Sequence, residues 1–300
     1  MNIPEQRIQI ALQKSGRLTD HSLDLLSRCG LKFTRSRDQL FCYGENMPID
    51  ILLVRDDDIP ALVSDDVCDL GIAGLNVVHE KRLQIGTDEQ PAMFDQVYSL
   101  DFGHCRLAIA APKDTEYCGP STLQGSRIAT SYPASVAEFL QQHGIDADIV
   151  YLSGAVEIAT RLGRADFICD LVCTGSTLAA NQLREVQTVF ESNAVVIQTR
   201  APLSQTKQDL VDRILQRVNG VLQVQESKYV MLHAPRSALK EIAALLPGSE
   251  SPTIIPLEGF DDKVAIHVVC RENVFWETLE NLKAVGASSL LVLPVEKMLV

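Results

Sequence analysis

The segment from Asp170 to Thr177 combines residue types that suit a sugar phosphate. An apolar strand, predicted over 165–172, carries Asp170, and the turn Thr174-Gly175-Ser176-Thr177 then begins a helix. Free backbone N–H groups at a helix start favour an anion, and a glycine lets the backbone approach it closely. The hydroxyls can donate to phosphate, while the carboxylate can accept from ribose hydroxyls. The same pattern is typical of a threonine-capped helix after a buried strand, so both interpretations stay open at this point.

Three more loops at predicted strand ends carry complementary charge. Lys14-Ser15-Gly16-Arg17 follows a strand over 7–12, Arg55 follows an apolar strand over 49–54, and Glu157 follows a strand over 147–152. Each is also an ordinary surface charge when taken alone. Because α/β proteins bind ligands at the carboxyl ends of strands, we expect these loops to meet in one cleft. Arginine suits phosphate oxygens there, since its planar fork binds them bidentately.

The elements that position these loops form two α/β lobes. Strands alternate with helices from residue 7 to about 73 and again from 105 to about 189. A weak repeat links the two lobes, since Cys68-Asp69-Leu70-x-x-x-Gly74 recurs as Cys169-Asp170-Leu171-x-x-x-Gly175, each at the predicted end of an apolar strand. The repeat predicts two related lobes that face each other across a cleft, as in bilobed binding proteins.

The tail follows a different plan. Strands over 228–233, 253–257, 264–270 and 289–293 and helices over 237–246 and 275–285 spell β-α-β-β-α-β, which is the ferredoxin-like order. A long amphipathic helix over 207–225 precedes it, so we place a domain boundary near residue 225. We therefore predict a first lobe over 1–104, completed by about 190–225, a second lobe over 105–189, and a small domain over 226–300.

Composition limits the classes of partner. The chain of 300 residues has a net charge of −12, so no general field attracts nucleic acid or an anionic membrane. The start lacks the features of a signal peptide and no apolar run could span a bilayer, which predicts a cytoplasmic protein. The 8 cysteines show no paired ligand spacing, and we expect most of them to be buried free thiols.

Taken together, these motifs resemble the long form of the ATP phosphoribosyltransferases. The matching segments are Leu12–Leu18, Glu45–Asp50, Val54–Pro60, Cys68–Gly74, Glu157–Ala159 and Asp170–Leu178, with Glu226–Tyr229, Leu246–Gly248, Ser251–Thr253 and Gly286–Ser289 in the tail. The likeness covers nearly the whole chain. It implies a two-lobed catalytic region similar to periplasmic binding proteins, followed by a ferredoxin-like, ACT-like regulatory domain.

The resemblance also implies a reaction. Family members join ATP to 5-phosphoribosyl 1-pyrophosphate at the N1 nitrogen of adenine, release pyrophosphate and need magnesium, which diphosphate oxygens hold with few protein ligands. By resemblance, Arg17, Arg55 and Lys14 offset phosphate and pyrophosphate charge. The phosphoribosyl-binding residues would be Glu157, Asp170, Thr174, Gly175, Ser176 and Thr177. The nucleotide or pyrophosphate wall would comprise Gly16, Asp69, Gly71 and Gly74, and we expect no dedicated metal cage in the protein.

For the tail, the resemblance implies feedback inhibition by histidine bound between subunits. His233, Thr253 and Ser288 are our candidates, because each lies in or beside a matching motif near a predicted strand end. The family also implies a homo-oligomer that exists as an active dimer and a closed hexamer, which supplies the two states that allostery requires.

Two other functions compete with this interpretation. A bilobed solute-binding or ligand-sensing protein would have similar lobes, but the phosphate-type turn and the ferredoxin-like tail argue against it. A regulatory subunit without catalysis would not need Lys14, Arg17, Arg55, Glu157 and Asp170 together. We therefore expect an enzyme.

Overall fold

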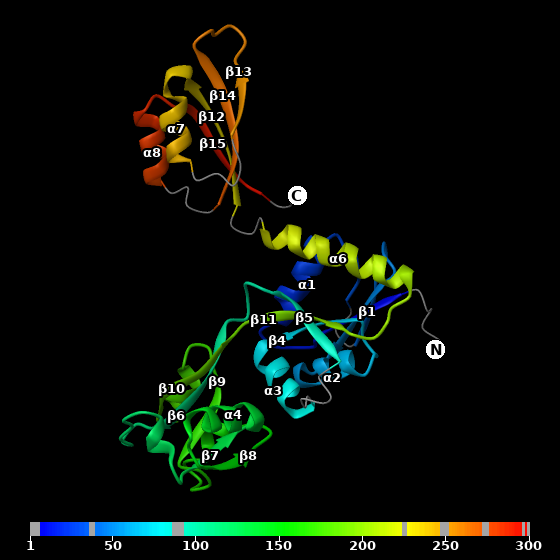
Figure 1. Ribbon diagram of the computed structural model, residues 1–300, viewed down its shortest axis with the longest axis vertical. Coiled ribbons are helices and arrows are strands. Elements are labelled where there is room, and N and C mark those ends of the chain that lie inside the picture. The colour runs from blue at the N-terminus through cyan, green and yellow to red at the C-terminus, as the bar shows by residue number, and fades with distance from the viewer. Residues whose placement is uncertain are drawn as a thin grey trace. The chain divides into compact units, whose positions relative to one another are not determined.

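The computed structural model describes residues 7–35, 40–85, 93–223, 227–246, 252–271, 276–295 and 298. The chain forms two compact units, Met1–Val211 and Asp212–Val300, and each is described by itself (Figure 1). The predicted boundary near residue 225 and the tail motif positions 226, 247–248 and 251 lie outside the described residues. Within these ranges, no helix is long and apolar enough to cross a membrane.

The first sheet of unit Met1–Val211 has six strands in the order β2-β3-β1-β4-β11-β5. Its strands are β1 (Ile8–Gln13), β2 (Phe41–Tyr43), β3 (Ile49–Val54), β4 (Leu70–Gly74), β5 (Phe94–Ser99) and β11 (Ala194–Thr199). β1 runs parallel to both β3 and β4, whereas β2, β5 and β11 pair antiparallel with their neighbours. The helices that follow β1, β3 and β4 are α1 (Thr19–Arg28), α2 (Ile59–Ser64) and α3 (Leu75–Ile85). We call this sheet with its helices the first lobe.

The second sheet has five strands in the order β10-β6-β9-β7-β8. Its strands are β6 (Cys105–Pro112), β7 (Arg127–Thr130), β8 (Asp148–Tyr151), β9 (Phe167–Val172) and β10 (Leu183–Ser192), with helices α4 (Pro133–His143) and α5 (Ser176–Ala180). β7 lies parallel to β8 and β9, and β6 runs antiparallel to β9 and β10. This second lobe is entered between β5 and β6 and left between β10 and β11, so the first lobe is completed by a strand that returns from the second (Figure 1).

The central strand β1 shows why the sequence folds this way. Its alternating pattern predicts one solvated face, yet five of its six residues are buried. The strand lies between β3 and β4 in the middle of the sheet, so both of its faces are covered. A parallel strand in this position is expected to be mostly apolar, and β1 follows that rule except at the buried Gln9 and at Gln13, which ends the strand.

The weak repeat between the lobes needs a correction. In the second lobe Asp170 lies inside β9, and Gly175 follows the strand. In the first lobe the buried strand is Leu70–Gly74 itself, so Asp69 precedes it and Gly74 ends it. The two copies therefore occupy different positions relative to their strands, and Asp69 lies at the amino end of β4 rather than at the carboxyl end.

Unit Asp212–Val300 contains the second part of α6 (Gln205–Gln223) and a four-stranded antiparallel sheet in the order β13-β14-β12-β15. The elements after α6 are β12 (Ser227–Pro235), α7 (Leu239–Leu245), β13 (Thr253–Pro256), β14 (Lys263–Arg271), α8 (Trp276–Ala284) and β15 (Ser288–Pro294). Alternate residues such as Val230, Leu232 and Ile266 form its core together with Ile242 of α7 and Leu282 of α8. Both helices cover one face of the sheet (Figure 1), and the predicted ferredoxin-like order is confirmed.

Six of the cysteines are buried and none of the 8 forms a disulfide, which confirms the prediction that most are core thiols. Cys118 and Cys173 are the two exposed ones.

Candidate active site

A pocket of about 440 Å³ lies between the two lobes. We call it the inter-lobe pocket. The first lobe supplies Arg55, Asp57, Val77, Glu80, Lys81 and Gln84, and the second supplies Ser131, Tyr132, Tyr151, Ser153 and Asp170. Most of these residues follow the carboxyl end of a parallel strand or lie near it, as the topology of α/β sheets predicts for a ligand site. Of the predicted residues, the structure thus brings Arg55 and Asp170 into one cavity.

The basic loop after β1 is shaped by a glycine and a glutamine. Gly16 has a φ of +133°, and a Cβ at that position would lie 2.7 Å from the Gln13 Nε2 atom. The Gln13 side chain folds over the loop and accepts a hydrogen bond of 3.1 Å from the Leu18 amide. Only glycine adopts this conformation readily. The loop leaves Lys14 exposed, while Arg17 is partly buried.

Arg17 is held at the point where the chain crosses between the lobes. Its guanidinium donates to the Gly103 carbonyl and, over 3.3 Å, to the Asn76 side-chain oxygen. Gly74 lies beside this contact, since a Cβ built at Gly74 would lie 3.4 Å from Arg17 Nη2 and 2.3 Å from the Asn76 side-chain oxygen. The structure therefore brings Arg17, Gly16 and Gly74 together at one edge of the first sheet.

Asn76 and Tyr132 are two residues that sequence reasoning missed. Asn76 is fully buried, and its amide nitrogen donates to the Tyr132 hydroxyl across 3.0 Å. Its side-chain oxygen accepts a hydrogen bond of 2.9 Å from Ser192, which ends β10. Asn76 thus joins the start of α3 to the second lobe. The available signal was a polar residue two positions after Gly74, in the first turn of the helix that follows β4.

Carboxylates of both lobes act on the Tyr132 hydroxyl. Burial raises the pKa of Tyr132, and the negative charges of Asp57, Asp170 and Asp56 raise it further, against the opposing hydrogen bond from Asn76. Asp56 and Asp57 belong to the first lobe, whereas Asp170 belongs to the second. The strand-end edge of the first lobe and that of the second lobe therefore face each other at Tyr132.

Asp56 is an unusually placed acid. One of its carboxylate oxygens, Oδ1, is buried and has no hydrogen-bond partner among the described residues. Burial and the neighbouring Asp57 charge raise the pKa of Asp56 to about 6, although Arg17 and the Gly74 backbone N–H act in the opposite direction. Perturbed acids of this kind cluster at functional sites.

The turn after β9 has a glycine at the residue before the helix. Gly175 precedes α5 with a φ of 77° and has no side chain to cap it. The Thr174 hydroxyl accepts from the Ser176 amide at 3.4 Å and shares a hydrogen bond of 3.0 Å with the Ser176 hydroxyl, and Thr177 is also exposed. The structure is therefore compatible with both interpretations of this turn, a threonine contact at a helix start and a site for an anion. Because α5 has only five residues, its exposed hydroxyls and backbone N–H groups offer more to an anion than its dipole does.

Asp170 is half-buried behind this turn. Burial raises its pKa, the Leu171 amide lowers it by a hydrogen bond of 2.8 Å, and the charge of Glu157 raises it. Glu157 lies in the short 3-10 helix Val156–Ile158, which follows a left-handed Ala155. The predicted pair of carboxylates is therefore close enough to interact.

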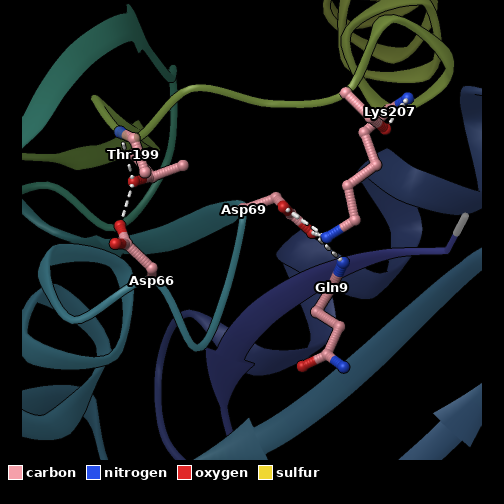
Figure 2. A network of polar contacts seen from close by, with 7 residues as sticks. Gln9, Asp66, Asp69, Thr199 and Lys207 are labelled. Carbon is pink, nitrogen blue, oxygen red and sulfur yellow. Dashed lines mark hydrogen bonds and ion pairs between the residues drawn. The ribbon is translucent and has the colours of Figure 1, made fainter. Parts of the chain in front are cut away.

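Two predicted residues lie away from this edge. Asp69 is buried at the amino end of β4, where it accepts hydrogen bonds from the Gln9 amide at 2.8 Å and from Lys207 Nζ at 2.9 Å (Figure 2). Gly71 is buried inside β4, and a Cβ there would lie 2.7 Å from the Ile59 side chain. The expectation that these two residues bind nucleotide is therefore not supported by their positions: one completes a buried ion pair and the other allows α2 to pack on the sheet.

The tail candidates lie on the C-terminal sheet. His233 in β12 is the register partner of Ser288 in β15, so these two are neighbours. Thr253 in β13 pairs with His267 of β14, which in turn pairs with Met231. Thr253 is therefore separated from His233 by the width of β14.

Comparison with known proteins agrees with these observations. The family model described as ATP phosphoribosyltransferase matches residues 55–220, more than half of the chain, and the model of the HisG C-terminal domain matches residues 225–297. An ATP phosphoribosyl transferase (HisG:HisZ) complex from Thermotoga maritima is 27% identical, with 72% of this chain and 98% of that chain covered and a TM-score of 0.58.

Two further solved structures show weaker similarity. The BvgS VFT2 domain of Bordetella pertussis is 13% identical over 72% of this chain and 88% of that chain, with a TM-score of 0.47. The probable amino-acid ABC transporter extracellular-binding protein ytmK of Bacillus subtilis is 13% identical over 73% of this chain and 93% of that chain, with a TM-score of 0.45. On the strength of the two family models, the chain belongs to the ATP phosphoribosyltransferases, the enzymes of the first step of histidine biosynthesis, and has the C-terminal domain of their long form.

Proposed function

We propose that the inter-lobe pocket is where this chain joins ATP to 5-phosphoribosyl 1-pyrophosphate. The adenine N1 nitrogen attacks the anomeric carbon and pyrophosphate leaves, giving phosphoribosyl-ATP. The observation that carries the proposal is that Arg55 of one lobe and Asp170 of the other line the same cavity. Such a displacement needs two polyanions held in line, and two facing strand-end edges supply that arrangement.

The second lobe binds the phosphoribosyl donor in this proposal. Thr174, Ser176 and Thr177 donate hydroxyls to the 5-phosphate, and the left-handed Gly175 lets backbone N–H groups approach it. Asp170 and Glu157 accept hydrogen bonds from the ribose hydroxyls. The interaction between the two carboxylates supports this, because both then face the same sugar.

The first lobe balances the charge of pyrophosphate and ATP. Arg17 and Arg55 are the principal cations, with Lys14 at the rim. Gly16 and Gly74 leave room for the Arg17 loop, as the close contacts of a Cβ at either position indicate. Lys81, which sequence reasoning missed, lines the same pocket and adds a further positive charge.

Magnesium fits this site as a substrate-borne ion. Within the described residues, no group of three or more His, Cys, Asp or Glu side chains is arranged to hold a metal. The ion would bind mainly to diphosphate oxygens, and Asp57, which lines the pocket on the first lobe, is a carboxylate that would hold its coordinated waters. When bound, it neutralises charge on the leaving pyrophosphate.

The C-terminal domain carries the regulation that we propose. Histidine binds at His233 and Ser288, which are neighbours in the sheet, with Thr253 further along. A homo-oligomer of dimers and hexamers supplies the two states. The spans 1–104 with about 190–225, 105–189 and 226–300, and the cytoplasmic location, stay predictions.

The direct test mixes the protein with ATP, 5-phosphoribosyl 1-pyrophosphate and magnesium and follows the product absorbance and pyrophosphate release. Turnover requires both substrates, and its absence would overturn the proposed function. Arg17→Ala and Thr174→Ala should each lower turnover by roughly 100-fold, since both side chains are predicted to face substrate. Thr174→Ala should leave the melting temperature nearly unchanged, whereas Arg17→Ala should also lower it, because it removes the hydrogen bonds to Gly103 and Asn76. Full activity of both variants would refute the residue assignment.

Histidine provides the second test. Added histidine should inhibit the full chain, and a His233→Ala variant should keep its turnover and lose the inhibition. Inhibition that survives in this variant would place the histidine site elsewhere.

A further inference from the structure

Glu80 of the first lobe reaches into the second lobe. It lies on α3, and the residue is only 6% exposed. One carboxylate oxygen accepts the Ala134 amide at 2.8 Å, and the other accepts the Ser135 amide at 2.8 Å and the Ser135 hydroxyl at 2.6 Å. Gln84, one turn further along α3, donates to the first oxygen at 2.9 Å. A buried carboxylate with four donors is fully satisfied.

Three of these donors, the two amides and the Ser135 hydroxyl, belong to the first turn of α4. The residue before α4 is Tyr132, whose side chain does not cap the helix, and Pro133 occupies the first helical position. The first amides of a helix need acceptors, and a carboxylate there is also favoured by the helix dipole. Glu80 therefore supplies from another lobe the cap that the sequence before α4 lacks.

This contact adds to the attachments that lie at the chain crossings between the lobes. The chain crosses over 100–104 and at Asn193, and the Asn193 side chain braces the two crossings by donating to the Leu100 carbonyl at 2.7 Å. Two neighbouring crossings leave a hinge free to bend. Helices α3 and α4 pack on each other, and in the sequence both lie away from the crossings (Figure 1). Their contact therefore opposes bending at the hinge.

We propose that Glu80 is a positioning residue of the transferase reaction. By capping α4 across the lobe interface, it holds the Ser131–Tyr132 segment and Asp170 in place opposite Arg55. This inference rests on the proposed function of the inter-lobe pocket, whose lining includes all of these residues. It also has a consequence for substrate binding: the N-terminus of α4 is filled by a carboxylate, so substrate phosphates are directed to the turn after β9.

The same pair of helices offers a matched control. Glu138 of α4 pairs with His79 of α3 at 2.7 Å, and its side chain is 36% exposed. An exposed pair contributes little, whereas loss of a buried acceptor leaves several donors unpaired. Glu138→Gln therefore changes the same interface and the same charge without removing the cap.

The experiment compares Glu80→Gln, Glu80→Ala and Glu138→Gln in the full chain. Steady-state kinetics with both substrates give kcat and each KM, and hydrogen exchange gives the protection of the amides at 134 and 135. We expect kcat to fall about 100-fold in Glu80→Ala and about tenfold in Glu80→Gln, because misplacement of this size is costly in a two-substrate displacement. The KM for the phosphoribosyl donor should stay within about twofold, because its turn lies wholly in the second lobe.

Protection should be lost at 134 and 135 and kept in β1, β4 and β9, while Glu138→Gln should match the wild type. Adding Ser135→Ala to Glu80→Ala should cause no further loss, because both substitutions break the same contact. Wild-type kinetics in both Glu80 variants would overturn the proposal. So would loss of protection throughout both sheets in Glu80→Gln, since Glu80 would then act on general stability. An inactive wild-type protein would instead overturn the proposed function, while the exchange at 134 and 135 still shows whether the cap exists.

Discussion

Replacement of Asp56 by asparagine should stabilise the protein at alkaline pH. Asp56 has a buried oxygen with no partner among the described residues, and its pKa is raised from 3.8 to about 6 by burial and the charge of Asp57. A raised pKa means that the folded state favours the neutral acid. The folded protein therefore holds the proton more tightly than the unfolded chain, and its stability falls as the pH rises from about 4 to about 6.

The size of the expected stabilisation follows from the pKa shift of Asp56. A difference of about 2.2 pKa units corresponds to roughly 3 kcal/mol at pH 8, at 1.36 kcal/mol per unit. At pH 4.5 most unfolded chains have lost the proton and most folded ones have kept it, so only about 1 kcal/mol remains. Asparagine has the same shape and no charge, so Asp56→Asn should gain about these amounts. For a unit of this size, the gain at pH 8 corresponds to a melting temperature higher by roughly 6–12 °C.

The assay is thermal unfolding of wild type, Asp56→Asn and the exposed neighbour variant Asp58→Asn at pH 8 and pH 4.5. We expect a large upward shift for Asp56→Asn at pH 8, a shift about one third as large at pH 4.5, and a change of less than about 2 °C for Asp58→Asn at either pH. Equal shifts at the two pH values would show that packing rather than charge is responsible. An unchanged melting temperature of Asp56→Asn at pH 8 would refute the argument that the ionised Asp56 carboxylate destabilises the folded protein. Asp56→Asn should also lower turnover, because proteins keep destabilising acids where they are needed for function.

Three further predictions concern the buried Asp69–Lys207 ion pair, the loop after β1 and the two exposed cysteines. Lys207→Met should lower the free energy of unfolding by roughly 3 kcal/mol, because it leaves the Asp69 carboxylate buried with the Gln9 amide as its remaining donor. Denaturant melts measure this loss. An unchanged KM for ATP in the same variant would show that Asp69 is structural and does not bind nucleotide. Gly16→Ala should lower the free energy of unfolding by roughly 1–3 kcal/mol and lower kcat, since an alanine resists a φ of +133° and its Cβ displaces Gln13. An active variant as stable as the wild type would contradict this and show that the loop can relax. Iodoacetamide should modify Cys118 and Cys173 before the buried cysteines, and the phosphoribosyl donor should protect Cys173 alone, as peptide mass spectrometry would show. Equal protection of Cys118 would place the donor away from the turn after β9.

Local pattern sufficed for the elements whose identity depends on neighbouring residues. The turn after β9, the basic loop after β1 and the β-α-β-β-α-β order of the tail are each set by apolar periodicity and by Gly175, Gly16 and similar turn residues. Strand β5 was not predicted, because its residues Phe94–Ser99 are mostly polar or exposed. It becomes a strand by pairing with β11, which lies about 100 residues away in the sequence, so no local signal could reveal it.

The same distinction explains the errors and omissions in the site. Asp69 and Asp170 occur in similar sequence surroundings, but β4 begins at Leu70, just after Asp69, whereas β9 begins at Phe167, three residues before Asp170. Asp69 therefore lies at the amino end of its strand and Asp170 near the carboxyl end of its own. Asn76, Tyr132 and Glu80 gain their importance from partners in the other lobe. A single sequence shows the residue types in each lobe. It does not show which of them meet across the interface.

The division of labour between the lobes accounts for why these interface residues matter. In the second lobe, the turn after β9 contains hydroxyls and lies beside carboxylates. The cations that can balance the charge of pyrophosphate lie on the first lobe. In the proposed function neither edge carries out the displacement alone, since one would hold the sugar and the other the charge of the departing pyrophosphate. The rate must therefore depend on the distance and angle between two sheets joined by short crossings. Contacts such as Asn76 with Tyr132 and Glu80 with α4 fix that geometry without touching the reacting atoms. A change that alters the lobe angle would alter turnover while leaving each binding surface intact, which makes this interface a suitable target for feedback regulation.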